Sequence, residues 1–170
     1  MREIQLTPTS YIVLGLIADA GEATPYELKQ RVDASIGHFW SLPRSQLYAE
    51  SARLARAGYL TEEQQQEGRR RKLYTLTDPG CDALKHWIDT PTHDFPELRD
   101  LAFLKIFFGA DPASMANAQL TVLRPLLENY EAVLATYPPT SQPGPRRTLQ
   151  TGIDHVNTSI RAWERIARET

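Results

Sequence analysis

Two short strand patterns with a basic stretch between them limit the fold of this chain more than any other feature. Tyr59-Leu60-Thr61 begins the first pattern, and Leu73-Tyr74-Thr75-Leu76 alternates apolar and polar residues in the second. The polar residues between them include Gly68 and end in four consecutive cations, Arg69-Arg70-Arg71-Lys72. Such a stretch is long enough for a hairpin loop, so the sequence predicts a β-hairpin whose loop is positively charged.

Three short helical segments precede the hairpin, and a fourth follows it. The first is the nearly continuous apolar run over residues 10–18, and the second begins at Thr24-Pro25, a cap residue followed by a first-turn proline. The third extends from Pro43 to Gly58, and the fourth begins at Thr77-Asp78-Pro79. Three helices, a strand, a basic loop, a strand and a helix are the element order of a winged helix-turn-helix.

Beyond Pro91 the sequence predicts helices alone. Residues 97–108 form an apolar helical segment, and Asp111-Pro112 caps a long helix, in which Pro125 predicts a kink. Residues 138–145 form a Pro/Gly/Ser linker before a last helix. In both long helices the apolar residues are spaced three and four apart, which is typical of a coiled-coil seam.

This spacing predicts an antiparallel helical hairpin whose seams are completed by a second subunit. The predicted dimerisation residues are Leu120, Leu123, Leu127, Tyr130, Leu134, Leu149, Ile153, Val156, Ile160 and Trp163. The fold class is therefore mainly helical, α+β through the wing, with two domains: a winged helix-turn-helix over residues 1–90 and an all-helical dimerisation domain over residues 91–170.

Composition limits where the protein works. No apolar run approaches the roughly 18 residues that a membrane span needs, and the N-terminus has no signal-peptide pattern. The single cysteine, Cys81, excludes an internal disulfide framework and is predicted to pack as a small apolar residue. We therefore expect a cytoplasmic protein with no membrane partner. Its net charge of −2 means that any grip on DNA must come from a focused basic patch.

The third helix is the predicted reading helix, because a helix-turn-helix inserts that element into the major groove. The residues that face away from Leu47 and Leu54 are the candidate DNA contacts. Arg44, Ser45 and Gln46, in the first turn, are expected to read base edges. Tyr48 and Arg53 are expected to contact phosphate oxygens, and Ala49 lies on the same face. Glu50 would repel phosphate unless it pairs with Arg53, three residues along, and this pairing is the expectation. In the wing, Arg69, Arg70, Arg71 and Lys72 are expected to contact phosphate or the minor groove.

Catalytic and metal-binding functions have little support in the sequence. The four histidines are scattered without a ligand pair on one helix, and no phosphate-binding loop or nucleophile motif is present. We therefore predict no enzyme activity, no metal and no cofactor. Aromatic residues could instead line an effector pocket between the two domains, and the candidates are Phe39, Trp40, Phe103 and Phe107. The alternative is that these aromatics, like Trp87 and Trp163, belong to ordinary core or interface packing.

The segments that form this pattern resemble the PadR-like family of bacterial transcriptional regulators. The matching segments are residues 11–16, Thr24-Pro25-Tyr26-Glu27-Leu28, Phe39-Trp40, Arg44-Ser45-Gln46-Leu47-Tyr48, residues 54–60, Gly68 to Tyr74, Leu76 to Gly80, Leu98-Arg99-Asp100 and Leu104 to Phe108. The resemblance covers most of the chain and is weakest after Asp111. It departs from the family at Glu50 and Ser51, where relatives often have neutral or apolar residues, and at Ala52, where some have a charge.

The resemblance implies a homodimer that binds a palindromic operator in double-stranded DNA. It also implies repression that a small ligand relieves, and phenolic acids are one effector type in members with a long C-terminal domain. We therefore expect a ligand-responsive transcriptional repressor. The alternative is a winged-helix module that contacts protein and scaffolds a complex without specific DNA binding.

Overall fold

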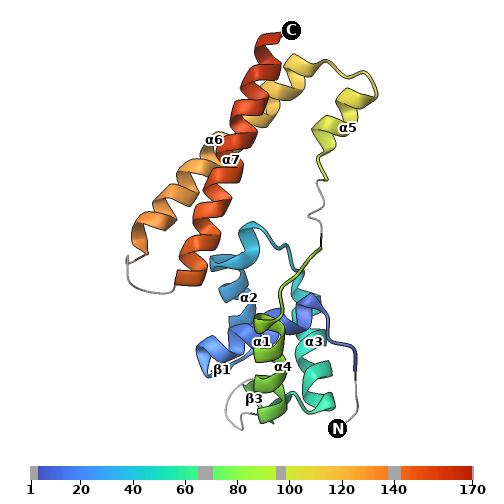
Figure 1. Ribbon diagram of the computed structural model, residues 1–170. Helices are drawn as coiled ribbons and strands as arrows, with labels where there is room; N and C mark the ends of the chain where they lie inside the picture. Colours follow the sequence, from blue (N-terminus) through green and yellow to red (C-terminus); the bar gives the residue numbers. More distant parts are fainter. Residues whose placement is uncertain (1–3, 65–70, 95–98, 138–142, 170) are drawn as a thin grey trace. The chain divides into compact units, whose positions relative to one another are not determined.

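A computed structural model describes residues 4–64, 71–94, 99–137 and 143–169 of the chain. The chain divides into two compact units, Met1–Asp94 and Phe95–Thr170, and each is described by itself (Figure 1). Throughout the described ranges, no helix is long and apolar enough to cross a membrane.

The first unit has the predicted order of helices and strands, and the winged helix-turn-helix is confirmed. Its elements are α1 (Pro8–Ala20), β1 (Glu22–Ala23), α2 (Pro25–Ala34), a 3-10 turn (Ile36–His38), α3 (Arg44–Ala57), β2 (Leu60–Gln64), β3 (Lys72–Leu76) and α4 (Asp78–Asp89). The sheet is antiparallel in the order β1-β3-β2. The sequence did not predict β1, because its two residues are too few to show an alternating pattern. Glu22 pairs with Thr75 and Ala23 with Tyr74, so β1 joins the sheet on the edge of β3 away from β2.

Short-range caps fix where these elements begin and end. The Thr24 hydroxyl accepts a hydrogen bond from the Glu27 amide, and the Glu27 carboxylate accepts one from the Thr24 amide, so α2 begins with a capping box. Gly58 ends α3 in the left-handed conformation, at φ 87°. A Cβ at Gly80 would lie 2.2 Å from the Tyr59 carbonyl oxygen, so only glycine fits where α4 crosses the start of β2.

The core of the first unit is closed within one chain. Leu28, Leu47 and Leu54 from α2 and α3 are completely buried. They pack with Val13, Leu14 and Ile17 of α1, Leu60 and Tyr74 of the sheet, and Leu84 of α4. Cys81 is exposed on α4, so the prediction that it packs as a core residue is wrong: Leu84, three residues along, is the side chain that this helix buries.

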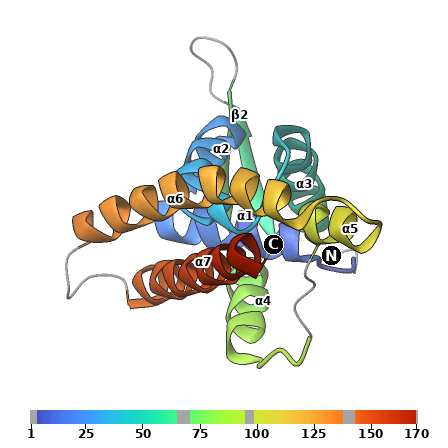
Figure 2. The same cartoon turned by 90° about the horizontal axis from the view of Figure 1, so that it is seen from above.

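The second unit is the predicted antiparallel helical hairpin. It consists of α5 (Leu101–Phe107), α6 (Pro112–Thr136) and α7 (Pro143–Glu169), and α6 and α7 lie side by side in both views (Figures 1 and 2). The Asp100 carboxylate accepts hydrogen bonds from the first amides of α5, which is why this helix begins at Leu101 and is shorter than the predicted 97–108. Within that prediction, residues 97 and 98 lie outside the described residues.

The described part of the predicted linker is helical. Residues 143–145 form the first turn of α7, where prolines are tolerated because the first amides of a helix have no intrahelical partner. The remaining linker residues, 138–142, lie outside the described ranges. The helix α6 continues on both sides of Pro125.

Candidate DNA-binding surface

The exposed face of α3 contains the residues that the sequence assigned to base contacts. Arg44, Ser45, Gln46, Tyr48 and Ala49 are exposed, because the helix buries Leu47, Ser51, Leu54 and Ala57 on its opposite side. The Ser51 hydroxyl donates to the Leu47 carbonyl oxygen, so this buried polar group is satisfied within the helix. The result is a polar helix face with Arg44 in its first turn.

Arg44 is held between two aromatic rings. Its guanidinium lies 5.4 Å from the ring centroids of both Tyr26 and Tyr48, and it donates a hydrogen bond of 3.1 Å to the Tyr48 hydroxyl. This hydrogen bond raises the pKa of Arg44, so the guanidinium is a permanent cation on the exposed surface. Stacked against two rings, the cation is restricted to fewer orientations than a free arginine.

Sequence reasoning missed Tyr26. It lies in the first turn of α2, is exposed, and accepts a hydrogen bond from the Gln30 side chain at 3.3 Å. The available signal was its position off the apolar face that Leu28 and Val32 define. Its pairing with Arg44 depends on how α2 packs against α3, and no local pattern specifies that.

Arg53 and Glu50 form the expected pair. The Arg53 guanidinium donates to both Glu50 carboxylate oxygens, at 2.7 and 2.8 Å, and Glu50 also accepts from the Ser10 hydroxyl of α1 at 2.5 Å. Burial disfavours the charged Glu50, but the hydrogen bonds from Arg53 and Ser10 and the charge of Arg53 outweigh it and lower the pKa of the carboxyl. Glu50 is therefore ionised at neutral pH, and it neutralises Arg53.

The base of the wing also contains compensated charges. Lys72 lies 2.7 Å from Glu62, and the Tyr74 hydroxyl donates to the same carboxylate at 2.9 Å. The hydrogen bond from Lys72, assisted by the one from Tyr74, lowers the pKa of Glu62. Arg71 is exposed just before β3, and its charge contributes to the lowered pKa of Glu27, which depends mainly on the Thr24 backbone amide. The other two wing cations of the prediction, Arg69 and Arg70, lie outside the described residues.

The four aromatic residues predicted for an effector pocket belong to different units. Phe39 and Trp40 follow the 3-10 turn of the first unit and are both exposed. In the second unit, Phe103 stacks on Trp163 with ring centroids 4.4 Å apart, and Phe107 is 81% exposed. Within its own unit, Phe103 is thus explained by packing on α7.

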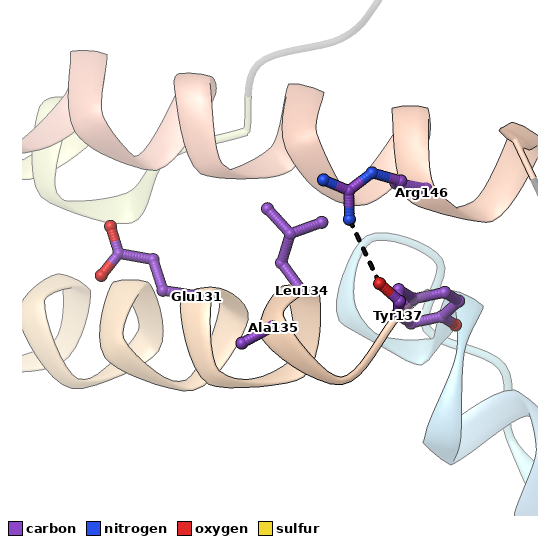
Figure 3. Close-up of a pocket in the computed structure, with 5 residues that line it drawn as sticks. All are labelled: Glu131, Leu134, Ala135, Tyr137 and Arg146. Carbon is purple, nitrogen blue, oxygen red and sulfur yellow. Dashed lines mark hydrogen bonds between the residues drawn. The ribbon is translucent and has the colours of Figure 1, made fainter. Parts of the chain in front are cut away.

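A shallow groove lies where α6 ends and α7 begins. It has a volume of about 380 Å³ and is lined by Glu131, Leu134, Ala135, Tyr137 and Arg146 (Figure 3). The Arg146 guanidinium points toward the Tyr137 carbonyl oxygen and donates to it at 3.5 Å, while Glu131 lies further along α6 (Figure 3). The groove thus has an acidic and a basic side chain with Leu134 between them.

The predicted dimerisation residues lie mostly inside the hairpin of one chain. Six of them are buried between α6 and α7, namely Leu120, Tyr130, Ile153, Val156, Ile160 and Trp163, and the other four are half-buried. The large exposed apolar side chains of this unit lie elsewhere, chiefly on and next to α5: Leu101, Leu104, Phe107 and Phe108. No cluster of three metal-ligating side chains occurs in the ranges that the structure describes.

Known proteins are similar to this chain in sequence and in fold. Residues 13–86 match the model of the transcriptional regulator PadR-like family. The chain is 30% identical over 147 residues to the negative transcriptional regulator PadR of Bacillus subtilis (strain 168), covering 79% of this chain and 80% of that protein. The chain belongs to the PadR-like family of transcriptional regulators.

Two solved structures have the same fold. Bacillus subtilis PadR in complex with operator DNA superimposes with a TM-score of 0.84 at 24% identity, covering 99% of this chain and 100% of that one. The same protein in complex with p-coumaric acid gives a TM-score of 0.76 at 23% identity, over 96% and 97% of the two chains. As a member of this family, the chain is a transcriptional regulator rather than an enzyme, and the scaffolding alternative is not favoured.

Proposed function

We propose that this protein is a dimeric, cytoplasmic repressor that binds a palindromic operator through its first unit and leaves it when a small aromatic acid binds. The observation that supports this proposal best is the exposed face of α3, where Arg44 is oriented by two tyrosine rings beside exposed Ser45 and Gln46. Only the major groove is wide enough for a helix and displays a distinct hydrogen-bonding pattern for each base pair.

The proposed roles follow from chemistry and position. Arg44 can donate two hydrogen bonds to guanine, and Gln46 can pair with adenine, each contact being worth about 1–3 kcal/mol of discrimination. Ser45 and Ala49 would lie against base edges between them. Tyr26 and Tyr48 present hydroxyls beside Arg44 and are assigned to phosphate oxygens. In the wing, Arg69, Arg70, Arg71 and Lys72 would approach the backbone or the minor groove.

A second copy of the chain is the proposed partner of the second unit. Leu101, Leu104 and Phe107 are more than half exposed on one short helix, and such a patch is uncommon on a monomer. Pairing through this surface and the half-buried residues of the hairpin would join two winged units. A twofold dimer presents its reading helices to half-sites roughly 34–36 Å apart, which accounts for a palindromic operator.

A small aromatic acid is the proposed effector. Bacillus subtilis PadR has been crystallised with p-coumaric acid, and this chain has exposed aromatic residues in both units. The proposed contact residues are Phe39, Trp40, Phe103 and Phe107. Such a ligand regulates only if it binds the operator-free conformation more tightly than the DNA-bound one.

The function is tested by selecting binding sites from a pool of random duplexes with the purified full-length protein. The proposal predicts enrichment of one palindromic sequence. Its affinity should fall steeply as salt rises and should exceed that of unrelated DNA by at least about a thousandfold. Adding p-coumaric acid, as a first effector probe, tests ligand release separately. If no sequence is enriched and all duplexes bind equally weakly, the repressor function is wrong.

A further inference from the structure

A network of hydrogen bonds fastens one flank of α3 to the start of α1. Arg53 donates to Glu50 through two nitrogens, to the Ser10 hydroxyl at 3.1 Å and to the Gln5 carbonyl oxygen at 3.2 Å. Ser10 is completely buried, and its hydroxyl also accepts from the Thr7 amide at 2.8 Å. Four of the hydrogen bonds that a guanidinium can donate are therefore made inside the protein.

Arg53 nevertheless lies at the rim of the reading face. It follows Gln46 by seven residues, or two helical turns, so both side chains leave the same side of α3. Its side chain is 32% exposed, whereas that of Glu50 is only 12% exposed. A cation in this position would ordinarily be counted among the phosphate contacts of a reading helix.

We infer that Glu50 is an affinity-limiting residue: its internal carboxylate pairs with Arg53, keeps that guanidinium from DNA phosphate and so lowers affinity for DNA of any sequence. This inference rests on the proposed role of α3 in reading DNA. Phosphate contacts add affinity without sequence information, so withholding one lowers the affinity for operator and for unrelated DNA by the same factor.

The geometry explains why Arg53 stays paired with Glu50 when DNA phosphate is nearby. A carboxylate and a phosphate both accept two parallel hydrogen bonds from a guanidinium, so they compete for the same donors. If Arg53 turned to phosphate, Glu50 would remain charged in a largely buried position with only the Ser10 hydroxyl as a partner. Leaving a buried charge unpaired is strongly unfavourable, and the Gln5 carbonyl holds the guanidinium on its other side.

The test compares Glu50→Gln with the wild type on an unrelated duplex across a salt series. Glutamine keeps the size and an acceptor oxygen but removes the charge that holds Arg53. The expected result is about 3- to 10-fold tighter binding to unrelated DNA at low salt, with the slope of log affinity against log salt steeper by about 0.9. Affinity for the operator should rise by the same factor, so the ratio of operator to unrelated affinity should stay unchanged. The control is Asp89→Asn, which makes the same charge change in the exposed Lys85–Asp89 pair of α4 and should leave the slope unchanged.

A double variant, Glu50→Gln with Arg53→Gln, keeps the test decisive if the single variant unfolds, which circular dichroism would show. It replaces both charges together, and it should bind unrelated DNA with the wild-type salt slope. A slope shallower than wild type by about 0.9 would show that Arg53 contacts phosphate in the wild type and would overturn the inference. An unchanged slope in a folded Glu50→Gln variant would also overturn it. The wild-type preference for operator, measured alongside, reports on the proposed function independently.

Discussion

The two units of this chain bury their apolar side chains to different degrees. In the first unit the core residues of four helices and the sheet are enclosed, and Leu28, Leu47 and Leu54 have no exposed surface. In the second unit the hairpin seam is enclosed, but Leu104 and Phe107 of α5 are 53% and 81% exposed. The first unit thus closes its core within one chain, although it too exposes large apolar side chains on α4 and after its 3-10 turn, whereas most of those that the second unit exposes lie on and next to α5.

We therefore assign DNA recognition to the first unit and the pairing of two chains to the second. The polar face of α3 is positioned by side chains of its own unit, through the Arg44 stack and the network at Glu50. A reading surface built this way needs nothing from another subunit to keep its shape. Spacing two such surfaces on DNA is a separate task, which we assign to the second unit, with its exposed apolar residues on α5.

The largest effect is expected in the first core. Leu47→Ala removes a completely buried side chain that supports the reading helix, and it should lower the free energy of unfolding by about 2–5 kcal/mol. Denaturant unfolding followed by circular dichroism measures this loss. The matched variant is Val122→Ala in the second unit, where the side chain is exposed and the expected change is within about 0.5 kcal/mol. Equal losses in the two variants would contradict the contrast in burial.

The next effect concerns pairing. Leu104→Ser combined with Phe107→Ser removes apolar area that a second copy is proposed to cover, and the dimer should weaken by about 2 kcal/mol or more. That corresponds to a roughly 30-fold higher dissociation constant, measurable by sedimentation over a range of concentrations. The circular dichroism spectrum of the protein should be unchanged, because the replaced side chains are exposed. If the double variant dimerises as tightly as the wild type, the dimer interface does not include α5.

A smaller effect is expected for base recognition. Arg44→Ala should cost about 1–3 kcal/mol on the selected operator and little on unrelated DNA, because it removes a base contact. Arg56→Ala is the matched control, because this exposed cation lies on the same helix without an aromatic partner among the contacts described. It should weaken binding to both DNAs alike. If the two variants lose the same specificity, Arg44 is not a base-reading residue.

The smallest effect is a pH dependence of stability. The pKa of Glu50 is lowered in the folded state, so its contribution is complete above the ordinary carboxyl range near 4.3 and is lost as pH falls through the lowered value. The stability difference between wild type and Glu50→Gln should therefore shrink on acidification below about pH 4. Unfolding free energies measured from pH 7 to pH 3 give this difference, and a constant value would contradict the assignment.

Local rules predicted the elements of the fold well, and long-range contacts account for most of what they missed. Caps such as Thr24-Pro25 and Gly58 define helix ends within a few residues, and the Glu50–Arg53 pair follows from helical spacing alone. The Ser10 hydroxyl reaches Glu50 across forty residues of chain, and no periodic pattern contains that contact. The short strand β1 is likewise defined only by its pairing with β3.

The seam of the second unit shows a different limit of prediction from sequence. A three-and-four spacing identifies which side chains a helix buries but not which chain buries them. Leu120, Ile153 and Trp163 pack within one hairpin, although the spacing would suit two subunits equally well. The exposed residues of α5 were visible in the sequence only as an apolar helical segment.

The most direct test of the account is a hydroxyl-radical footprint of the full-length protein on its selected operator. A twofold dimer with one reading helix in each half-site should give two protected patches related by twofold symmetry and separated by one helical turn of DNA or a multiple of it. Both patches should disappear together in the Leu104→Ser, Phe107→Ser variant at concentrations where it is monomeric. A single asymmetric patch, or two patches that persist in the monomeric variant, would contradict the division between a reading unit and a pairing unit.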